Sequence, residues 1–214
     1  LNKMAQAQVA LQAYDEAVSL YAQAASAYRA SGNPAKAAVA LRQAGQIRYD
    51  QANYNDSRRY YEQALALFSE SADAGEQAQT LWQMALAAGA AGQPQTAVAD
   101  YTQALTIFRS LGDTANERTT LVLLATVHQF QGDWLRSLAL WQQIRDIDRQ
   151  SGKRDDQAMS AYSSGLIYAA LGQSARAGEA YQQALALYRA DGNRASEAFV
   201  LVNLATLSSS SGDN

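Results

Sequence analysis

A recurrence at a fixed interval along the chain constrains the fold more than any other sequence feature. Shifting the sequence so that Tyr21 falls on Tyr61 superposes five aromatic residues in one column, which consists of Tyr21, Tyr61, Tyr101, Trp141 and Tyr181. Two neighbouring columns also agree: Gln23, Gln63, Gln103, Gln143 and Gln183 form one, and Ala24, Ala64, Ala104, Ile144 and Ala184 form the other. A repeat of about 40 residues predicts one small supersecondary unit per repeat, with a core made continuous by stacking the units.

Glycines interrupt each repeat at two places. One set comprises Gly92, Gly132, Gly172 and Gly212, and the other comprises Gly32, Gly112, Gly152 and Gly192. Because glycine readily adopts the left-handed backbone conformation that ends many helices, the two sets predict two helices in each repeat.

Residues that favour helix starts support this division. Asn33 followed by Pro34 has the pattern of an N-cap and a first helical residue, and Pro94 has the proline role in another helix. Three further capping candidates follow glycines directly, namely Asp113, Asp133 and Asn193. Asp155 and Asp156 place negative charge at a predicted helix N-terminus, which suits the helix dipole. We prefer this role to a catalytic carboxylate pair, because no other group of that chemistry accompanies them.

The turns and caps together define the expected helices. The first helices of the repeats are predicted near residues 34–51, 75–91, 114–131, 154–171 and 194–210. The second helices are predicted near residues 14–31, 54–71, 94–111, 134–151 and 174–191. Leu1 aligns with Leu41 and Leu81, so we expect the chain to open partway through another first helix. The prediction is an all-α solenoid of about five 40-residue repeats and about 11 helices.

Composition agrees with helices and excludes several function classes. The chain is 48% hydrophobic, much of it alanine, and has only two prolines, which favours close-packed helices. A net charge of -3 argues against nucleic acid as a partner. The chain has no cysteine, so disulfides and thiolate metal sites are excluded. No apolar run of about 18 residues is present, so we expect a soluble chain without membrane insertion; its location is unknown, with the cytoplasm favoured.

The columns resemble the tetratricopeptide repeat. One repeat carries the family pattern as Leu41, Ala44, Gly45, Ser57, Tyr61 and Ala64, and another as Leu121, Leu124, Ala125, His128, Ser137, Trp141 and Ile144. The spacing is longer than the usual repeat of about 34 residues and is similar to the longer-repeat branch known from cortical-polarity adaptors, kinesin light chains and bacterial signalling proteins. The resemblance implies a right-handed α-α superhelix that binds proteins. It also implies close helix crossings at the small residues Gly45, Ala85, Ala125, Gly165 and Ala205.

In this family the first helices line the concave face, so the resemblance implies that a protein or peptide partner binds there. The candidate partner-binding residues are Arg42, Tyr49, Gln79, Trp82, Leu86, Val122, Phe130, Met159, Tyr162 and Phe199. Trp82, Tyr162 and Phe130 are the expected anchors, because aromatic residues are enriched at interface centres. The alternative is that each aromatic packs against a neighbouring first helix.

Charged and amide residues refine this prediction. Some family members hold a carboxylate with basic groove residues, but the comparable places here carry Asn2, Gln6, Gln46, Gln79 and Gln83, which does not favour that activity. A looser basic cluster of Lys36, Arg42, Arg48, Arg58 and Arg59 suits either an acidic peptide or, as we prefer, local partners such as Asp50, Asp56 and Glu62. Arg145 and Asp148 replace apolar residues of other repeats, which indicates local exposure, an ion-pair network or contact with another domain.

The sequence contains no pattern of catalytic chemistry. His128 is the single histidine and falls in a packing column, and no metal ligand or nucleophile lies at motif spacing. The segment 89–92 has two glycines but lacks the lysine and hydroxyl residue of a phosphate loop. We therefore predict neither an enzyme nor a bound cofactor or metal.

Three functions remain open. A protein-interaction scaffold is favoured over a regulatory array fused to a catalytic or signalling domain, and over a solenoid that self-associates through uncapped ends. Residues 1–214 are expected to form a single solenoid domain. Because Gly212 and Asp213 align with Gly132 and Asp133, we also expect it to be a fragment of a longer array.

Overall fold

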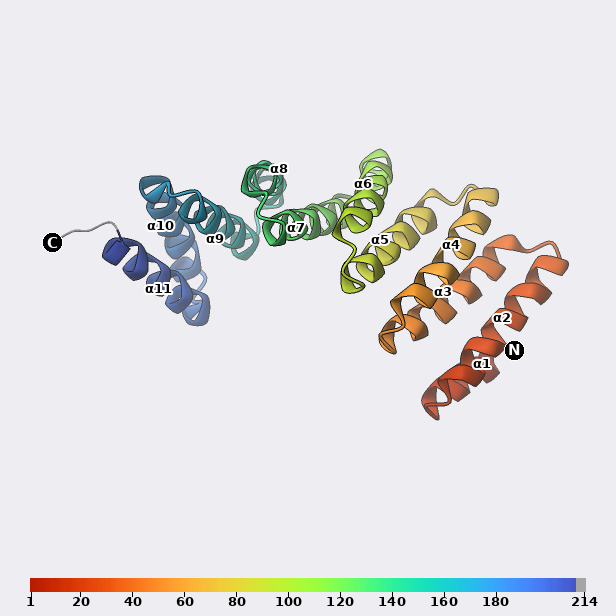
Figure 1. Cartoon of the computed structure of the whole chain (residues 1–214). Coiled ribbons are helices and arrows are strands. Elements are labelled where there is room, and N and C mark those ends of the chain that lie inside the picture. The colour runs from red at the N-terminus through yellow and green to blue at the C-terminus, as the bar shows by residue number, and fades with distance from the viewer. Residues whose placement is uncertain (211–214) are drawn as a thin grey trace. The chain divides into compact units, whose positions relative to one another are not determined.

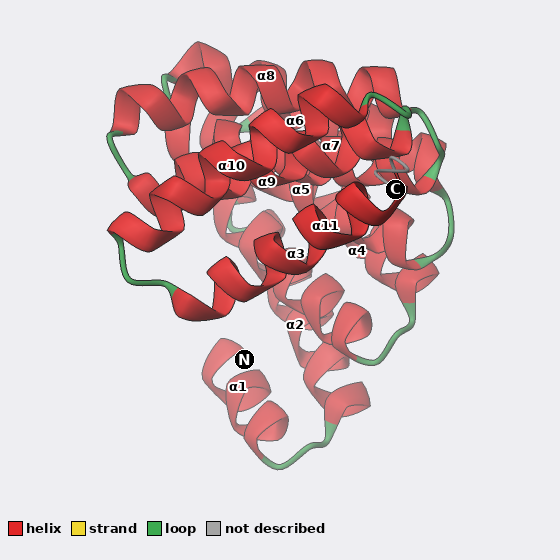
Figure 2. Cartoon of the chain, turned by 90° about the vertical axis from the view of Figure 1, so that its left-hand side faces the viewer, coloured by secondary structure: helices red, strands yellow, loops and turns green. Residues whose placement is uncertain are grey.

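The computed structural model describes residues 1–210, and this part of the chain contains helices and short turns without a strand (Figures 1 and 2). The helices are α1 (Asn2–Ala10), α2 (Tyr14–Ala30), α3 (Pro34–Asp50), α4 (Tyr54–Glu70), α5 (Ala74–Ala90), α6 (Pro94–Leu111), α7 (Thr114–Phe130), α8 (Trp134–Ser151), α9 (Arg154–Ala170), α10 (Ser174–Ala190) and α11 (Arg194–Ser210). The predicted all-α class and the ten predicted ranges are confirmed, with bounds that differ by no more than one position.

The described helices fall into two compact units. The first unit comprises residues 1–120 and the second begins at Leu121, so that α7 starts in one and continues in the other. In the first unit each helix from α1 to α5 packs against the next one along the chain. In the second unit α8 packs against α9, α9 against α10, and α10 against α11.

A left-handed residue stands at each turn between the helices, at every twentieth position from residue 12 to residue 192. Seven of these residues are glycines, which include all the predicted ones except Gly212, a residue outside the described part. The other three are Gln12, Ala52 and Ala72, with φ angles of 59°, 58° and 54°. The glycine pattern therefore predicts the turns correctly, but three turns form without glycine and store backbone strain.

Side-chain caps begin six of the described helices. The predicted caps Asn33, Asp113, Asp133 and Asn193 each accept a hydrogen bond from a backbone N–H three residues later. Asn53 and Asp73 do the same, although no glycine before them drew attention to these positions. Pro94 occupies the first turn of α6 as predicted, without a side-chain cap from Gln93.

The aromatic column forms the centre of the helix pairs. Its five members are between 1% and 4% exposed. In the pair α3/α4, a Cβ atom added to Gly45 would lie 2.7 Å from Cδ1 of Tyr61, and in α9/α10 one added to Gly165 would lie 2.6 Å from Cδ1 of Tyr181. The predicted close crossings are thus confirmed at these two glycines.

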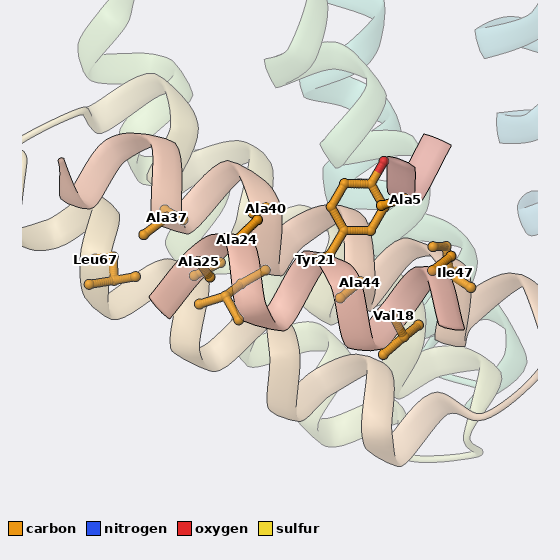
Figure 3. Close-up of a cluster of buried hydrophobic side chains, with 14 of the residues drawn as sticks. Ala5, Val18, Tyr21, Ala24, Ala25, Ala37, Ala40, Ala44, Ile47 and Leu67 are labelled. Atoms are coloured by element: carbon orange, nitrogen blue, oxygen red, sulfur yellow. The ribbon is translucent and has the colours of Figure 1, made fainter. Parts of the chain in front are cut away.

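Alanine lets the helices of the first unit approach each other closely. Figure 3 shows the ring of Tyr21 among small side chains that include Ala5, Ala24 and Ala44. These three alanines are almost completely buried. Ala85 and Ala125 are also fully buried, whereas Ala205 of α11 is exposed.

Four second helices form a polar contact with the first helix that follows them, each time through the residue at position 77 or its repeat equivalents 117, 157 and 197. Gln77 and Gln157 donate to the backbone carbonyls of Phe68 and Asp148, which lie near the ends of α4 and α8. Glu117 and Glu197 accept at the same position from Arg109 and Arg189, at 2.8 Å and 2.7 Å. Asp148 is completely buried, so the expectation of local exposure is wrong for that residue.

Candidate partner-binding surface

A groove on the first-helix face of the first unit lies between α1 and α3 and has a volume of about 360 Å³. Its lining consists of Asn2, Gln6, Val9, Tyr21, Val39, Ala40, Gln43, Gln46, Ile47 and Asp50. Tyr21 and Ile47 are buried, while Gln6, Gln43 and Asp50 are exposed. The groove therefore combines an apolar floor with exposed carboxamides and one carboxylate.

Gln46 is the centre of a hydrogen-bond network on this face. Its Oε1 accepts from the hydroxyl of Tyr61 at 3.3 Å and from Nε2 of Gln83 at 3.4 Å, and its Nε2 donates to Asp50 at 2.8 Å. Burial raises the pKa of Tyr61 to about 12, and the nearby Asp50 and Tyr49 act in the same direction. The phenol is protonated at neutral pH with or without this shift, and its hydrogen bond to Gln46, together with that of Gln83, holds Gln46 between α4 and α5.

Two carboxamide oxygens beside this network lack a hydrogen-bond partner. They are Oδ1 of Asn2 and Oε1 of Gln83, and both atoms are buried. The amide nitrogen of Asn2 donates to the hydroxyl of Tyr28 at 3.4 Å. Only Asn2 belongs to the groove lining, and an unpaired buried acceptor of this kind is unfavourable.

The predicted residues of the first unit are half-buried. Arg42 pairs with Glu76 of α5 and places its guanidinium 5.4 Å from the ring centre of Phe68. Tyr49 packs against Tyr54 with ring centres 5.5 Å apart. Trp82 packs against a buried cluster in α5 and α6, and Gln79 and Leu86 lie on the same helix, α5. Much of the contact of Trp82 is therefore packing within the repeats, which is the alternative role considered for the aromatic residues. A role in partner binding stays a prediction for all five residues.

The predicted partner-binding residues of the second unit include two exposed side chains and three half-buried ones. Phe130 is 89% exposed and Phe199 is 67% exposed. Val122, Met159 and Tyr162 are half-buried. The hydroxyl of Tyr162 accepts from Nδ2 of Asn203 in α11 at 3.1 Å, and its ring lies 5.9 Å from that of Tyr181. Phe130 and Phe199 are thus free to contact a partner, whereas Tyr162 already joins α9 to α10 and α11.

Sequence reasoning missed part of the groove. Gln43, Val9 and Tyr21 line it together with the predicted amide positions Asn2, Gln6 and Gln46. Gln43 precedes Gln46 by one helical turn, which was a usable signal. Tyr21 was predicted only as a packing residue of the aromatic column, and the structure adds its contribution to the floor of the groove.

A second kind of groove lies on the second-helix face. Between α2 and α4 a cavity of about 290 Å³ has Leu41 at its floor, and between α4 and α6 a cavity of about 360 Å³ has Leu81 at the same repeat position. Gln63 and Gln103 line these two cavities at equivalent places. The first unit therefore offers two faces with different chemistry, and fewer carboxamides line each second-helix groove than the first-helix groove.

The basic cluster does not form a free positive patch. Arg58 and Arg59 pair with Glu62 and Asp56, as we preferred. Arg58 also contacts Asp100 at 2.6 Å, and it donates to the backbone carbonyl of Met84. Arg48 pairs with Asp15 at 2.6 Å, while Asp50 takes its hydrogen bond from Gln46. These carboxylates neutralise much of the cluster and join neighbouring repeats.

His128, the single histidine, lies near the end of α7, next to the turn that leads into α8. His128 is 8% exposed, and its Nδ1 lies 3.8 Å from Oδ2 of Asp133, the residue that caps α8. Among the described residues, no group of three or more histidine, cysteine, aspartate or glutamate side chains is arranged to hold a metal ion. No described helix is long and apolar enough to span a membrane.

Repeated helix pairs, regularly spaced left-handed turns and a buried aromatic column define the class of all-α solenoid proteins. The family follows from the sequence, because the tetratricopeptide repeat profile matches residues 1–70, 36–110 and 116–190. The chain belongs to the tetratricopeptide repeat family. Such repeats form scaffolds for interaction between proteins and are generally non-catalytic.

Solved structures share this fold at low sequence identity. The apo form of RapI has a TM-score of 0.76 and 17% identity over 83% of this chain and 50% of RapI. A STAND protein with a tetratricopeptide repeat sensor from Pyrococcus horikoshii has a TM-score of 0.75 and 13% identity over 96% of this chain and 32% of that protein. Kinesin light chain-like repeats from Podosopora anserina have a TM-score of 0.70 and 17% identity, with 90% and 94% covered. No curated protein matches the sequence significantly.

Proposed function

We propose that this chain binds an extended peptide segment of a partner protein in the first-helix groove between α1 and α3. The observation that carries the proposal is the row of carboxamides along an open groove of about 360 Å³ with an apolar floor. The exposed carboxamides of Gln6 and Gln43 each offer both a donor and an acceptor, which matches the N–H and C=O groups of a peptide backbone. An extended peptide presents these groups unpaired and gains hydrogen bonds on binding.

The charge in the groove indicates the composition of the peptide. Asp50 is the one carboxylate in the lining, and no lysine or arginine lines the groove. The phenol of Tyr21 is neutral at physiological pH, and burial raises its pKa further. A neutral or basic peptide with a small apolar side chain directed at Tyr21 and Ile47 fits this lining better than an acidic one.

The second unit supports a separate contact. Phe130 and Phe199 are large exposed apolar side chains on first helices, and aromatic anchors carry much of the energy at protein interfaces. A partner that continues beyond the groove of the first unit gains from burying either ring. We assign the groove the main role, because it has defined walls and a defined polar pattern.

The proposal is tested by selecting peptides from a random library against the chain and measuring their affinity for two matched variants. Gln43→Lys places a charged side chain in the first-helix groove, and Gln63→Lys makes the same change in the second-helix groove. We expect Gln43→Lys to weaken the selected peptides at least about tenfold and Gln63→Lys to leave them unchanged. The opposite ranking, or a library without any binder, contradicts the proposal.

A regulatory array is the second candidate. The repeats of the STAND protein from Pyrococcus horikoshii are described as a sensor, and this chain spans 32% of that protein's length. In such an array the same groove binds the signal, and the readout lies in another domain. Measuring the activity of the complete natural polypeptide with and without a selected peptide separates the candidates, because a pure scaffold shows no change of activity.

A further inference from the structure

A groove on the second-helix face of the second unit carries polar residues where the equivalent groove of the first unit has alanine. It lies between α8 and α10, has a volume of about 450 Å³, and its lining includes Gln142, Arg145, Tyr168, Arg176, Glu179 and Gln183. The groove between α2 and α4 has Ala22, Ala25 and Gln63 at the positions equivalent to Gln142, Arg145 and Gln183. The two grooves are therefore the same feature of the repeat, but they differ in chemistry.

Arg145 of α8 stands at a repeat position that is otherwise apolar. The equivalent residues are Ala25, Leu65, Leu105 and Leu185. Arg145 is half-buried, and no described carboxylate forms an ion pair with it, whereas Arg58 of α4 pairs with Asp100 at 2.6 Å. Of the roles that the sequence left open for Arg145, a local ion-pair network is thus absent from the described residues. A half-buried charge without a counter-ion is unfavourable, so this side chain gains from an anion that enters the groove.

Arg176 brings a second guanidinium to the groove from α10. Its guanidinium carbon lies 5.9 Å from the ring centre of Tyr168, and its Nη1 donates to Oε1 of Gln173 at 3.1 Å. The side chain is exposed, and it forms no ion pair with a carboxylate of the described part of the chain. The two contacts position the guanidinium and leave its charge without a counter-ion.

The rest of the lining adds one negative charge and two carboxamides. Glu179 is exposed and is the one carboxylate among the lining residues, so two guanidiniums and one carboxylate leave a net positive charge in the groove. Gln142 of α8 and Gln183 of α10 are also exposed, and each offers a donor and an acceptor. The groove therefore suits a ligand that has negative side chains and free backbone N–H and C=O groups.

We propose that this groove binds an acidic segment of a partner protein, whose carboxylates pair with Arg145 and Arg176. A guanidinium can donate two parallel hydrogen bonds to one carboxylate, which gives the contact direction as well as strength. The carboxamides of Gln142 and Gln183 bind the backbone of the same segment. This site lies on second helices of the second unit and prefers acidic residues, so it does not rest on peptide binding in the first-helix groove.

The test measures, by fluorescence anisotropy, how the chain binds a labelled peptide of alternating glutamate and serine. Arg145→Leu introduces the leucine of three equivalent positions and is expected to weaken binding at least about tenfold. The same variant should unfold at the same or a higher temperature, because it removes a half-buried charge without a counter-ion. Arg136→Gln is the matched control, since it removes a positive charge from the opposite side of α8 and should leave the affinity unchanged.

A gain of affinity complements these losses. Glu179→Gln removes the carboxylate of the lining and is expected to strengthen binding of the acidic peptide about threefold, which damage to the fold cannot produce. A glutamine–serine peptide should bind at least about tenfold more weakly than the acidic one, and inorganic phosphate at the same concentration should not displace it.

Four results overturn the proposal. They are a wild-type chain that does not bind the acidic peptide, an equal affinity for the glutamine–serine peptide, equal losses in Arg136→Gln and Arg145→Leu, and displacement by inorganic phosphate, which would reveal a simple anion site. A lower unfolding temperature of Arg145→Leu with unchanged peptide affinity would likewise return Arg145 to a structural role.

Discussion

At the scale of single residues, the aromatic column supports the fold most directly. Its members contact small residues of the facing helix, as Tyr61 does with Gly45 and Tyr181 with Gly165. The column was visible in the sequence because the same packing geometry recurs in each repeat. The ion pairs within α4 were predicted, but those between repeats were not, since Arg42 with Glu76 and Arg58 with Asp100 depend on how successive repeats stack.

Trp141 tests the register of the column. It is 4% exposed, so Trp141→Ala should reduce the free energy of unfolding by about 3–5 kcal/mol through lost apolar contact and a cavity. Its indole nitrogen is buried without a hydrogen-bond partner, so Trp141→Phe should lose much less. Urea unfolding of both variants provides the measurement. A negligible loss in Trp141→Ala would show that the column is not the core.

Alkaline pH tests the buried phenols. The phenol of Tyr61 titrates at about 12 in the folded chain and at about 10 when unfolded, so the native state binds more protons between these values. Stability from this group is fully present below pH 10 and is lost as pH rises through 12, by about 2–3 kcal/mol. Urea unfolding at pH 9 to 11 should show the decline, and Tyr61→Phe should make it shallower. An equal slope in both chains would contradict this assignment.

At the scale of helices, the sequence predicted the bounds closely because glycines and capping residues mark most turns. The exceptions have a physical origin. Ala52 and Ala72 adopt left-handed backbone conformations that their own chemistry disfavours, and the packing of α3, α4 and α5 imposes them. The groove between α1 and α3 was likewise not predicted, because its shape depends on how the side chains of three helices pack.

Replacing a strained non-glycine residue at a turn by glycine should stabilise the folded chain. Ala72→Gly should raise the free energy of unfolding by about 0.5–1 kcal/mol, because glycine relieves the left-handed strain by more than it adds in chain entropy. Ala66→Gly in the middle of α4 is the control and should lower it by about 0.5–1 kcal/mol. Thermal and urea unfolding of the two variants should therefore move in opposite directions. Parallel losses would mean that the turn at Ala72 is unstrained.

At the scale of the whole molecule, membership of the tetratricopeptide repeat family accounts for the fold, and the surfaces distinguish this chain within it. The family pattern places Gln46 on a first helix, but the network that joins it to Tyr61, Gln83 and Asp50 follows from the packing of three helices. Trp82 is a second example: the repeat spacing predicts that it lies on the first-helix face, but it does not predict that the side chain is half-buried.

The central claim is that the first-helix face of the first unit binds a peptide. Nuclear magnetic resonance of the glutamine side-chain amides tests it directly, because Gln6 and Gln43 line the first-helix groove while Gln63 and Gln103 line the second-helix grooves. On adding a selected peptide, we predict that the resonances of Gln6 and Gln43 shift and those of Gln63 and Gln103 stay in place. Shifts confined to Gln63 and Gln103 would contradict the account.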